Sequence, residues 1–299
     1  MTFFHGAKKP GPYFEGWYLK HQSPGGKSLA LIPAFHAGRD GRRSASLQII
    51  TDAGSWWLEY PAEEFRASGD SFHVEIGGAL FHEGGMTIGL RRDGLSLQGE
   101  LRYGPFAALR RDIMGPFRFL PGMQCSHGVL SMGHSLEGSL RLNGEVLDFS
   151  GGIGYVETDR GKSFPDAYLW SQCVWPDPDG GSIMLAAASV PTPAGSFTGC
   201  ICALLYRGRE YRLATYRGAR IESCSAAGAV IRQGRLRLEA EALEARGQAL
   251  RAPAEGRMER GIRESLCAKV RYRLWSGGTL LLCRTDCRAS FEYAAGEAE

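Results

Sequence analysis

Two stretches of the chain repeat one pattern. The first reads Trp17-Tyr-Leu-Lys-His-Gln-Ser-Pro-Gly-Gly-Lys-Ser-Leu-Ala-Leu31, and the second reads Tyr168-Leu-Trp-Ser-Gln-Cys-Val-Trp-Pro-Asp-Pro-Asp-Gly-Gly-Ser-Ile-Met-Leu185. Each has an aromatic segment, a turn rich in Pro and Gly, and then Ser followed by an apolar segment; Ser28 aligns with Ser182 at an offset of 154 residues. Aromatic and apolar segments on either side of such a turn are typical of two antiparallel strands. The pattern therefore predicts a duplicated β unit of about 150 residues.

Alternation of apolar and polar residues continues through the rest of the sequence, and helical periodicity is weak. It occurs over residues 72–76, 86–90, 95–101 and 235–243, and a period of two indicates a half-buried strand. The dipeptides Asp40-Gly41, Asp93-Gly94 and Asn143-Gly144 favour hairpin turns. Many short antiparallel strands favour an up-and-down barrel or a sandwich, and a barrel also removes exposed edges. We expect an all-β chain with a first domain over residues 1–155 and a second over residues 156–299.

One uncharged segment is long enough to suggest a membrane span. It runs from Gly180 to Tyr206 and has no charged residue over 27 residues. Pro191, Pro193 and Gly195 interrupt it near the middle, and proline and glycine punctuate strands more readily than they continue a spanning helix. We expect two buried strands here, over residues 183–190 and 197–205, joined by a turn.

Composition and charge exclude several classes of protein. The 299 residues are 43% hydrophobic and 22% charged, which is ordinary for a globular protein, and the net charge of +3 is too small to indicate a nucleic-acid partner. The charge is uneven, because residues 207–273 contain sixteen Lys plus Arg against eight Glu. This basic second half is consistent with a solvated outer barrel face, or with peripheral contact with an anionic membrane surface.

The spacing of the cysteines and the absence of several short motifs argue against further classes of site and enzyme. The eight cysteines form no CxxC pair and have no metal-ligand spacing, and Cys200 and Cys202 are expected to share one face of a strand as core residues. With no secretory signal at the N-terminus, we expect a cytoplasmic location with reduced thiols. Nucleophile-elbow, phosphate-loop, HExxH and dinucleotide motifs do not occur in the sequence, which argues against common hydrolase, kinase, metalloprotease and NAD-dependent functions. We expect no metal.

The richest stretch for chemistry is Gly154-Tyr-Val-Glu-Thr-Asp-Arg-Gly-Lys-Ser-Phe-Pro-Asp-Ala-Tyr-Leu-Trp-Ser-Gln-Cys173. Glu157 and Asp159 have the same parity and project together from an extended segment. Two neighbouring carboxyl groups resist ionising together, which leaves one of them protonated. A protonated acid beside aromatic rings suits protonation of an alkene, because the rings stabilise the cation that forms.

Aromatic and amide side chains follow these acids. Tyr168, Trp170 and Gln172 are expected to line one face of the next strand. The alternative for the two acids is structural: they cap a loop against Arg160 and Lys162.

A second acid lies among aromatic residues near the start of the chain. Strand alternation places Tyr13, Glu15 and Trp17 on one face, where Glu15 is partly desolvated. The alternative is that Trp17 closes the barrel base and Glu15 pairs with a nearby Arg or Lys. His127 is a further candidate, either lining a cavity or acting as a base.

Four motifs together resemble the tocopherol cyclase family. They are Tyr13-Phe-Glu-Gly-Trp-Tyr-Leu-Lys20, Met114-Gly-Pro-Phe117, His127-Gly-Val-Leu-Ser-Met-Gly-His134 and the stretch from Gly154 to Cys173. The resemblance spans most of the chain. It implies a relation to carotenoid hydratase-like and lipocalin-like proteins, with two consecutive calycin-type antiparallel β-barrels.

The resemblance also implies a chemistry. Plant members of that family close a chromanol ring on a prenylated hydroquinone: an acid protonates the alkene of the tail, and the phenol oxygen attacks the tertiary cation. Transferred by motif, the pocket residues are Glu15, Trp17, Glu157, Asp159, Trp170 and Gln172, with Tyr13 and His127 as further substrate-binding candidates. The implied partner is a lipophilic small molecule, and no cofactor is needed because the reaction is redox-neutral.

One departure from the family pattern bears on this chemistry. The family has Asp-Trp-Gly where this chain has Asp159-Arg160-Gly161. An arginine facing the cation repels it, which weighs against cyclisation. Alternatively Arg160 pairs with Asp159, keeps it ionised, and leaves Glu157 as the acid.

Three functions follow from these observations. The first is a cyclase or isomerase acting on a prenylated (hydro)quinone or a related isoprenoid. The second is a non-catalytic binding protein for a lipophilic molecule, and the third is a hydratase that adds water to an isoprenoid alkene with His127 positioning the water.

Overall fold

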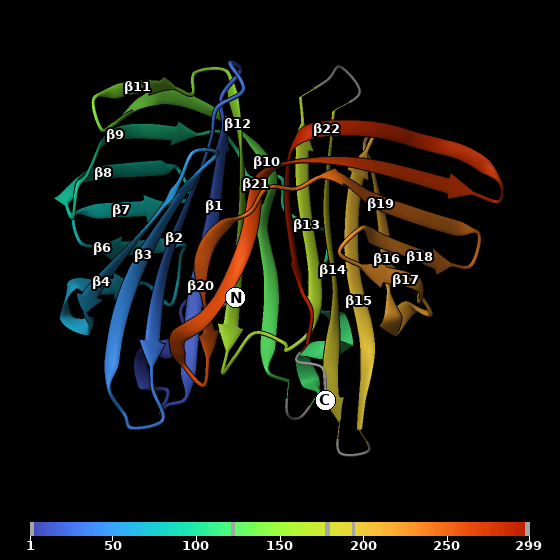
Figure 1. Cartoon of the computed structure of the whole chain (residues 1–299), viewed down its shortest axis with the longest axis horizontal. Coiled ribbons are helices and arrows are strands. Elements are labelled where there is room, and N and C mark those ends of the chain that lie inside the picture. The colour runs from blue at the N-terminus through green and yellow to red at the C-terminus, as the bar shows by residue number, and fades with distance from the viewer. Residues whose placement is uncertain (1–2, 121–122, 177–179, 193–194, 297–299) are drawn as a thin grey trace. The chain divides into compact units, whose positions relative to one another are not determined.

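The chain is built almost wholly from antiparallel strands (Figure 1). The structure is a computed structural model that describes residues 3–120, 123–176, 180–192 and 195–296. In these ranges the helical segments are four short 3-10 turns: η1 (Gly6–Lys8), η2 (Ala62–Glu64), η3 (Gly115–Phe119) and η4 (Thr215–Arg217). The strands form one sheet of twelve and one of ten. The prediction of an all-β chain with two antiparallel barrels is confirmed.

The first sheet contains the strands from β1 to β12. Their bounds are β1 (Tyr13–Gln22), β2 (Ser28–Ala37), β3 (Arg43–Thr51), β4 (Ser55–Pro61), β5 (Phe65–Ala67), β6 (His73–Ile76), β7 (Ala79–His82), β8 (Gly85–Arg92), β9 (Leu95–Tyr103), β10 (Cys125–Leu142), β11 (Glu145–Asp148) and β12 (Gly152–Gly161). The order is β4-β3-β2-β1-β12-β10-β9-β8-β7-β6-β5, with β11 paired to β10. The turn η2 joins the two end strands β4 and β5, and β3 contacts β6 across this junction.

The second sheet repeats this plan. Its strands are β13 (Tyr168–Trp175), β14 (Gly181–Thr192), β15 (Gly195–Tyr206), β16 (Arg209–Ala214), β17 (Arg220–Ser225), β18 (Gly228–Gln233), β19 (Leu236–Glu244), β20 (Gln248–Ala254), β21 (Arg257–Ser276) and β22 (Thr279–Ala294). The order is β16-β15-β14-β13-β22-β21-β19-β18-β17, with β20 paired to β21. The turn η4 joins the end strands β16 and β17. In both sheets the first strand pairs with the last, β1 with β12 and β13 with β22, as an internal duplication predicts.

The chain forms two compact units whose segments alternate along the sequence. Unit 1 comprises Met1–Ala108, Val129–Ser163 and Leu250–Gly261, and unit 2 comprises Leu109–Gly128, Phe164–Ala249 and Ile262–Glu299. The boundary expected between residues 155 and 156 lies within β12, all of which belongs to unit 1. Residues 250–261 are bound to the rest of unit 1 by polar contacts: the Gln48 amide donates to the Arg251 carbonyl at 2.9 Å and accepts from the Arg251 N–H at 2.9 Å.

Each unit has its own hydrophobic core. Tyr13, Trp17 and Leu19 alternate along β1 into the core of unit 1. In unit 2, Cys200 and Cys202 lie in the core, as the sequence predicted. The eight cysteines are thiols and form no disulfide with one another, and the thiols of Cys200 and Cys202 have raised pKa values because they are buried.

Two of the three predicted hairpin turns have the backbone of a two-residue turn, and the third, Asp40-Gly41, lies in the longer connection between β2 and β3. Asn143 and Gly144 connect β10 to β11 with φ values of 48° and 92°, and Asp93 and Gly94 connect β8 to β9 with φ values of 52° and 77°. Two consecutive positive φ angles are the requirement of a type I′ hairpin turn, which is why Asn-Gly and Asp-Gly occur there.

The uncharged segment from Gly180 to Tyr206 forms β14 and β15, which pair along their lengths, while residues 193–194 of the expected turn lie outside the described residues. Among the described residues, no helix combines the length and apolar character needed to cross a bilayer.

Candidate functional site

The predicted acids Glu15, Glu157 and Asp159 lie on two neighbouring strands but on opposite faces of the sheet. β1 and β12 pair antiparallel, with Glu15 opposite Arg160, Gly16 opposite Asp159, and Tyr18 opposite Glu157. Partners in an antiparallel pair project to the same side. Glu15 therefore shares the face of Trp17, which lies in the core of unit 1, whereas Glu157 and Asp159 share the other face with Tyr18.

Glu157 forms the most distinctive contact on the second face. Its side chain is 4% exposed, and the Tyr155 hydroxyl donates a hydrogen bond to its Oε2 at 2.5 Å. Burial raises the pKa of Tyr155 well above its ordinary value, and the charges of Glu157 and Asp159 raise it further. The phenol therefore stays neutral and remains a hydrogen-bond donor to the carboxyl group.

The side chains of Arg160 and Asp159 project from opposite faces of β12. Adjacent residues of β12 project to opposite faces, so Arg160 lies on the face of Glu15, and its charge acts on Tyr13. The expectation that Arg160 pairs with Asp159 does not fit this placement. The same geometry directs the arginine away from the face that carries Glu157, which removes the reason to expect repulsion of a cation there.

Glu15 is enclosed by hydrogen-bond donors. Its side chain is 1% exposed; it accepts from the Tyr13 hydroxyl at 2.8 Å and from the His5 backbone N–H at 2.8 Å, and its other oxygen lies 2.8 Å from His5 Nδ1. Phe4 packs against Trp17 and Phe35 beside it. Burial, followed by the Glu15 charge, raises the pKa of Tyr13. This arrangement ties the segment around η1 to β1, which differs from the Arg or Lys partner expected for Glu15.

The interior of unit 1 also holds a buried polar cluster away from Glu15. His21 Nε2 lies 2.7 Å from the Tyr103 hydroxyl, the Tyr103 ring lies 4.7 Å from the His134 ring, and Ser131 Oγ lies 3.0 Å from His134 Nδ1. Burial lowers the pKa of His21 to about 4 and that of His134 to about 3. Both imidazoles are therefore neutral near pH 7, and they line the packed core.

In unit 2, the predicted face of β13 is confirmed by the register. Trp170 is opposite Glu292 of β22, and Gln172 is opposite Ser290, so Tyr168, Trp170 and Gln172 share one face with Glu292. The Tyr168 hydroxyl donates to Glu292 Oε1. Glu264 of β21 is in turn opposite Glu292.

His127 lies near the start of β10 and is partly buried. It belongs to unit 2, whereas Glu15, Glu157 and Asp159 belong to unit 1.

The sequence analysis did not predict several residues that contact the candidate acids. Tyr155 has the parity of Glu157 within the quoted stretch, so strand alternation was sufficient to find it. His5, Glu264 and Glu292 lie outside the motifs, and only the strand pairing brings them to their partners.

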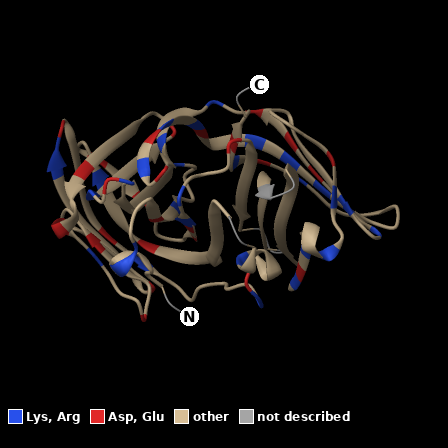
Figure 2. Ribbon diagram, turned by 90° about the horizontal axis from the view of Figure 1, so that it is seen from below, with Lys and Arg blue, Asp and Glu red and all other residues tan. Residues whose placement is uncertain are grey.

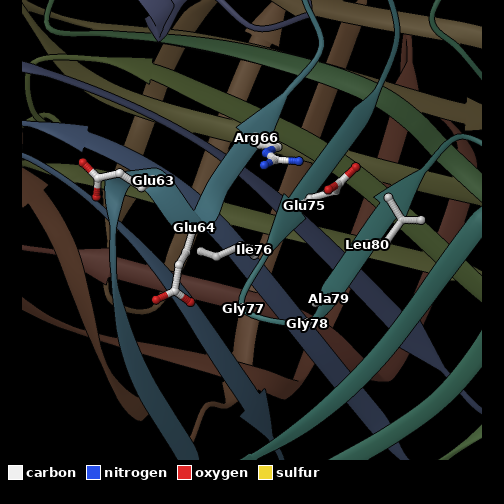
Figure 3. Close-up of a pocket in the computed structure, with 9 residues that line it drawn as sticks. All are labelled: Glu63, Glu64, Arg66, Glu75, Ile76, Gly77, Gly78, Ala79 and Leu80. Carbon is white, nitrogen blue, oxygen red and sulfur yellow. The ribbon is translucent and has the colours of Figure 1, made fainter.

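A surface cleft of unit 1 lies elsewhere (Figure 3). It has a volume of about 480 Å³ and is lined by residues of η2, β5, β6 and β7, including Glu63, Glu64, Arg66 and Glu75. None of the predicted acids lines it. The cleft is distinct from the candidate site, because β5, β6 and β7 are several strands away from β1 and β12 in the sheet.

The basic residues of the second half are largely engaged in ion pairs where they lie on β17, β18, β19 and β21. Arg273 lies 2.7 Å from Glu239, Arg271 lies 2.6 Å from Glu241, and both Arg237 and Arg273 lie over the ring of Trp275. Charged residues of both signs therefore mark these strands (Figure 2). Contact of this half with an anionic membrane stays a prediction.

Comparison with known proteins gives a likeness in fold. No protein-family model and no curated protein matches the chain. Among solved structures, CghA with Sch210972 has a TM-score of 0.59 at 10% identity, covering 96% of this chain and 90% of that chain; a second CghA structure gives 0.60 at 10% identity with the same coverage. Kievitone hydratase from Nectria haematococca gives 0.54 at 9% identity, covering 98% of this chain and 93% of that chain. The chain thus has the lipocalin-like two-barrel fold of these proteins.

Proposed function

We propose that the protein is an enzyme that adds an oxygen nucleophile to an alkene of a lipophilic isoprenoid substrate, in the form of a tocopherol cyclase-like ring closure. The observation that carries the proposal is the buried Tyr155–Glu157 hydrogen bond at 2.5 Å, on a face shared with Asp159 and Tyr18. The motifs that resemble the cyclase family include this pair. A carboxyl group held by a neutral phenol among aromatic side chains suits delivery of a proton to carbon.

The proposed reaction balances without a cofactor. Glu157 gives its proton to one alkene carbon, and a tertiary cation forms on the other. The substrate's phenol oxygen attacks this cation, and the phenol proton returns to the Glu157 carboxylate. Tyr155 stabilises the carboxylate between the two transfers through its hydrogen bond, while the Tyr18 ring and the Asp159 charge favour the cation.

Hydration is the second candidate, and the same proton transfer begins it. Kievitone hydratase, one of the proteins with the same fold, is by its name a hydratase. In this form water replaces the phenol oxygen as nucleophile. A third candidate, a binding protein without catalysis, uses the same residues only as contacts.

Product analysis separates the three candidates. The protein is incubated with a prenylated hydroquinone in water labelled with deuterium and heavy oxygen. A cyclase gives a chromanol with one carbon-bound deuterium and no heavy oxygen. A hydratase gives an alcohol that carries both labels, and a binding protein returns the ligand unchanged.

Amide variants test the role of the acid. We expect Glu157→Gln to reduce turnover by about 100-fold or more, because an amide has no acidic proton to transfer, and Asp159→Asn to reduce it less. Glu137→Gln, at an exposed position on β10, is the control. Full turnover in both Glu157→Gln and Asp159→Asn contradicts the proposal.

A further inference from the structure

Aromatic rings of unit 2 gather where the turn η3 lies beside the ends of β14 and β15 (Figure 1). The Phe117 ring of η3 lies 6.2 Å from the Phe197 ring of β15 and 5.3 Å from the Tyr216 ring of η4. Phe117 and Tyr216 are half-buried, whereas Phe197 is exposed, as are Phe119 and Leu120 at the end of η3. We call Phe117, Phe119, Leu120 and Phe197 the η3 patch.

The η3 patch concentrates exposed apolar side chains. Seven large apolar side chains are exposed among the described residues, and three of them belong to this patch: Phe119 at 74%, Leu120 at 36% and Phe197 at 37%. The other four are spread over β11, β19 and β22. Single exposed apolar residues are ordinary, but a group of them on one surface marks a site of interaction.

The backbone that leads into η3 is fixed by hydrogen bonds. Arg212, whose side chain is buried, donates to the carbonyl oxygens of Arg111 and Asp112 at 2.7 Å each. The Tyr216 hydroxyl donates to the Ile113 carbonyl oxygen at 2.9 Å. The exposed rings of the η3 patch are therefore carried by a segment that is anchored to β16 and η4.

Arginines accompany the η3 patch. Residues 109–120 and 215–217 contain four arginines and one aspartate, and residues 189–199 contain no charge. The Arg118 guanidinium lies 4.5 Å from the centre of the Phe119 ring and 3.6 Å from Asp112. Arg217 is exposed in the last turn of η4, which contacts η3. This surface is therefore both apolar and basic, unlike β19 and β21, where glutamates pair with the arginines.

We propose that the η3 patch docks this protein on an anionic lipid bilayer. The side chains of Phe119, Leu120 and Phe197 enter the interface, where aromatic rings are favoured at the level of the headgroups. Arg118 and Arg217 bind lipid phosphates. A guanidinium on a long apolar stem reaches a phosphate while the neighbouring ring inserts, and its planar fork matches the phosphate oxygens.

The size of the η3 patch favours a bilayer over a protein partner. Its three exposed side chains present roughly 300 Å² of apolar surface, since a whole aromatic side chain has about 150–250 Å². A stable protein complex buries about 800 Å² on each partner. A bilayer needs no matching surface, because a few inserted apolar side chains combine with attraction between arginines and anionic lipids.

Vesicle sedimentation tests the docking. The full chain is mixed with phosphatidylcholine vesicles, with and without phosphatidylserine, at low and at high salt. We expect tighter binding with phosphatidylserine and weaker binding at high salt, because salt screens the charges. Phe119→Ser should weaken binding by about 10-fold and Arg217→Gln by about 5-fold. Because both side chains are exposed, the melting temperature should not change.

Matched variants outside the η3 patch are the controls. Leu280→Ser removes an apolar side chain that is 50% exposed on β22, and Arg91→Gln removes an exposed arginine of β8. We expect both to bind vesicles as the wild type does. Absence of wild-type binding, or equal loss in Phe119→Ser and Leu280→Ser, overturns the inference. A lipid-free dimer that Phe119→Ser dissociates, measured by light scattering, overturns it in favour of a second copy of the chain.

This inference is independent of the proposed function. The vesicles contain no prenylated hydroquinone, so docking that needs Phe119 stands even when that compound is returned unchanged. Conversely, turnover of a prenylated hydroquinone by a protein that does not bind vesicles upholds the proposed function and removes the docking surface.

Discussion

Two tyrosine–glutamate pairs lie on neighbouring strands, and only one of them contains the acid that we propose to be reactive. Tyr155 donates to Glu157 on β12, and Tyr13 donates to Glu15 on β1; in each pair the residues are two apart. The pairs lie on opposite faces of the sheet. Glu15 has further donors from His5, whereas Glu157 lies beside Asp159, whose charge reaches Tyr155.

The paired tyrosines allow a matched comparison. We expect Tyr155→Phe to lower kcat by about 10-fold or more, because a hydrogen bond to a charged group contributes about 1.5–3 kcal/mol. Tyr13→Phe should lower the free energy of unfolding by about 1–2 kcal/mol with kcat unchanged. Turnover of the prenylated hydroquinone and urea unfolding measure the two effects. Equal loss of kcat in both variants contradicts the assignment.

Buried histidines make stability depend on pH. Burial lowers the pKa of His36 to about 3 and of His21 to about 4, whereas the unfolded chain binds these protons near pH 6.5. Below about pH 6.5 the unfolded state therefore holds more protons, and the free energy of unfolding falls as pH falls, by about 1.4 kcal/mol per pH unit for each such histidine. This stability is fully present above pH 6.5.

Urea unfolding at pH 7.5 and pH 5 measures the slope. We expect His36→Gln to reduce this slope, because one proton of the difference between the folded and unfolded states is removed. A slope that is the same in wild type and His36→Gln contradicts the argument.

Much of the residue-scale geometry followed from strand parity. The shared face of Tyr13, Glu15 and Trp17 and the shared face of Glu157 and Asp159 were predicted correctly. Whether two such faces coincide depends on register between distant strands, which alternation within one strand does not determine. Glu15 was therefore grouped with acids that project from the opposite side of its own sheet.

At the scale of elements, β12 approaches the interior cluster of unit 1 through a glycine. A Cβ atom on Gly154 would lie 2.3 Å from His134 Nε2. The His134 ring has little freedom to move, because it packs 4.7 Å from the Tyr103 ring and 4.8 Å from the Phe106 ring. The missing side chain is what allows the strand to pass the imidazole.

We therefore expect Gly154→Ala to lower the free energy of unfolding by about 1–3 kcal/mol, the usual effect of overpacking. Gly89→Ala on β8 is the control, since a Cβ atom there meets nothing within 4 Å, and it should be neutral or slightly stabilising. Denaturant midpoints of the two variants give the comparison. Equal midpoints contradict the packing argument.

The sequence predicted the positions of many strands but not which distant strands pair with each other. Residues 86–90 and 95–101 became β8 and β9, joined by the predicted Asp-Gly turn. The pairing of β21 with β22, which places Glu264 opposite Glu292, is interrupted by bulges. Bulges shift register without changing the alternation that the sequence displays, so this acid pair was not foreseen.

At the scale of the whole molecule, the alternating segments of the two units restrict how the chain can be divided. The aligned turns predicted the duplication correctly. That residues 250–261 belong to unit 1 could not be predicted, because their composition does not differ from that of their neighbours in the sequence. A fragment of residues 1–163 lacks Arg251, the partner of the buried Gln48 amide, and Glu255, which pairs with Arg39 at 2.7 Å.

We expect that fragment to unfold with a broad thermal transition, and the same fragment joined by a flexible linker to residues 250–261 to unfold cooperatively. Circular dichroism melting curves measure the difference. A sharp transition for the short fragment alone means that the contacts of residues 250–261 are dispensable.

Because the first and last strands of each sheet pair with each other, neither sheet can be completed until its last strand has been synthesised. β13 pairs with β22, so Tyr168 meets Ala294 across more than a hundred residues of chain, and such distant contacts slow folding. Unit 2 is unable to close until residues 279–294 have left the ribosome, whereas the first sheet joins its first and last strands once residues 152–161 have emerged. Each nascent barrel therefore exposes unpaired edges until its last strand has emerged, a period in which chaperones that shield β edges would determine the yield of native protein.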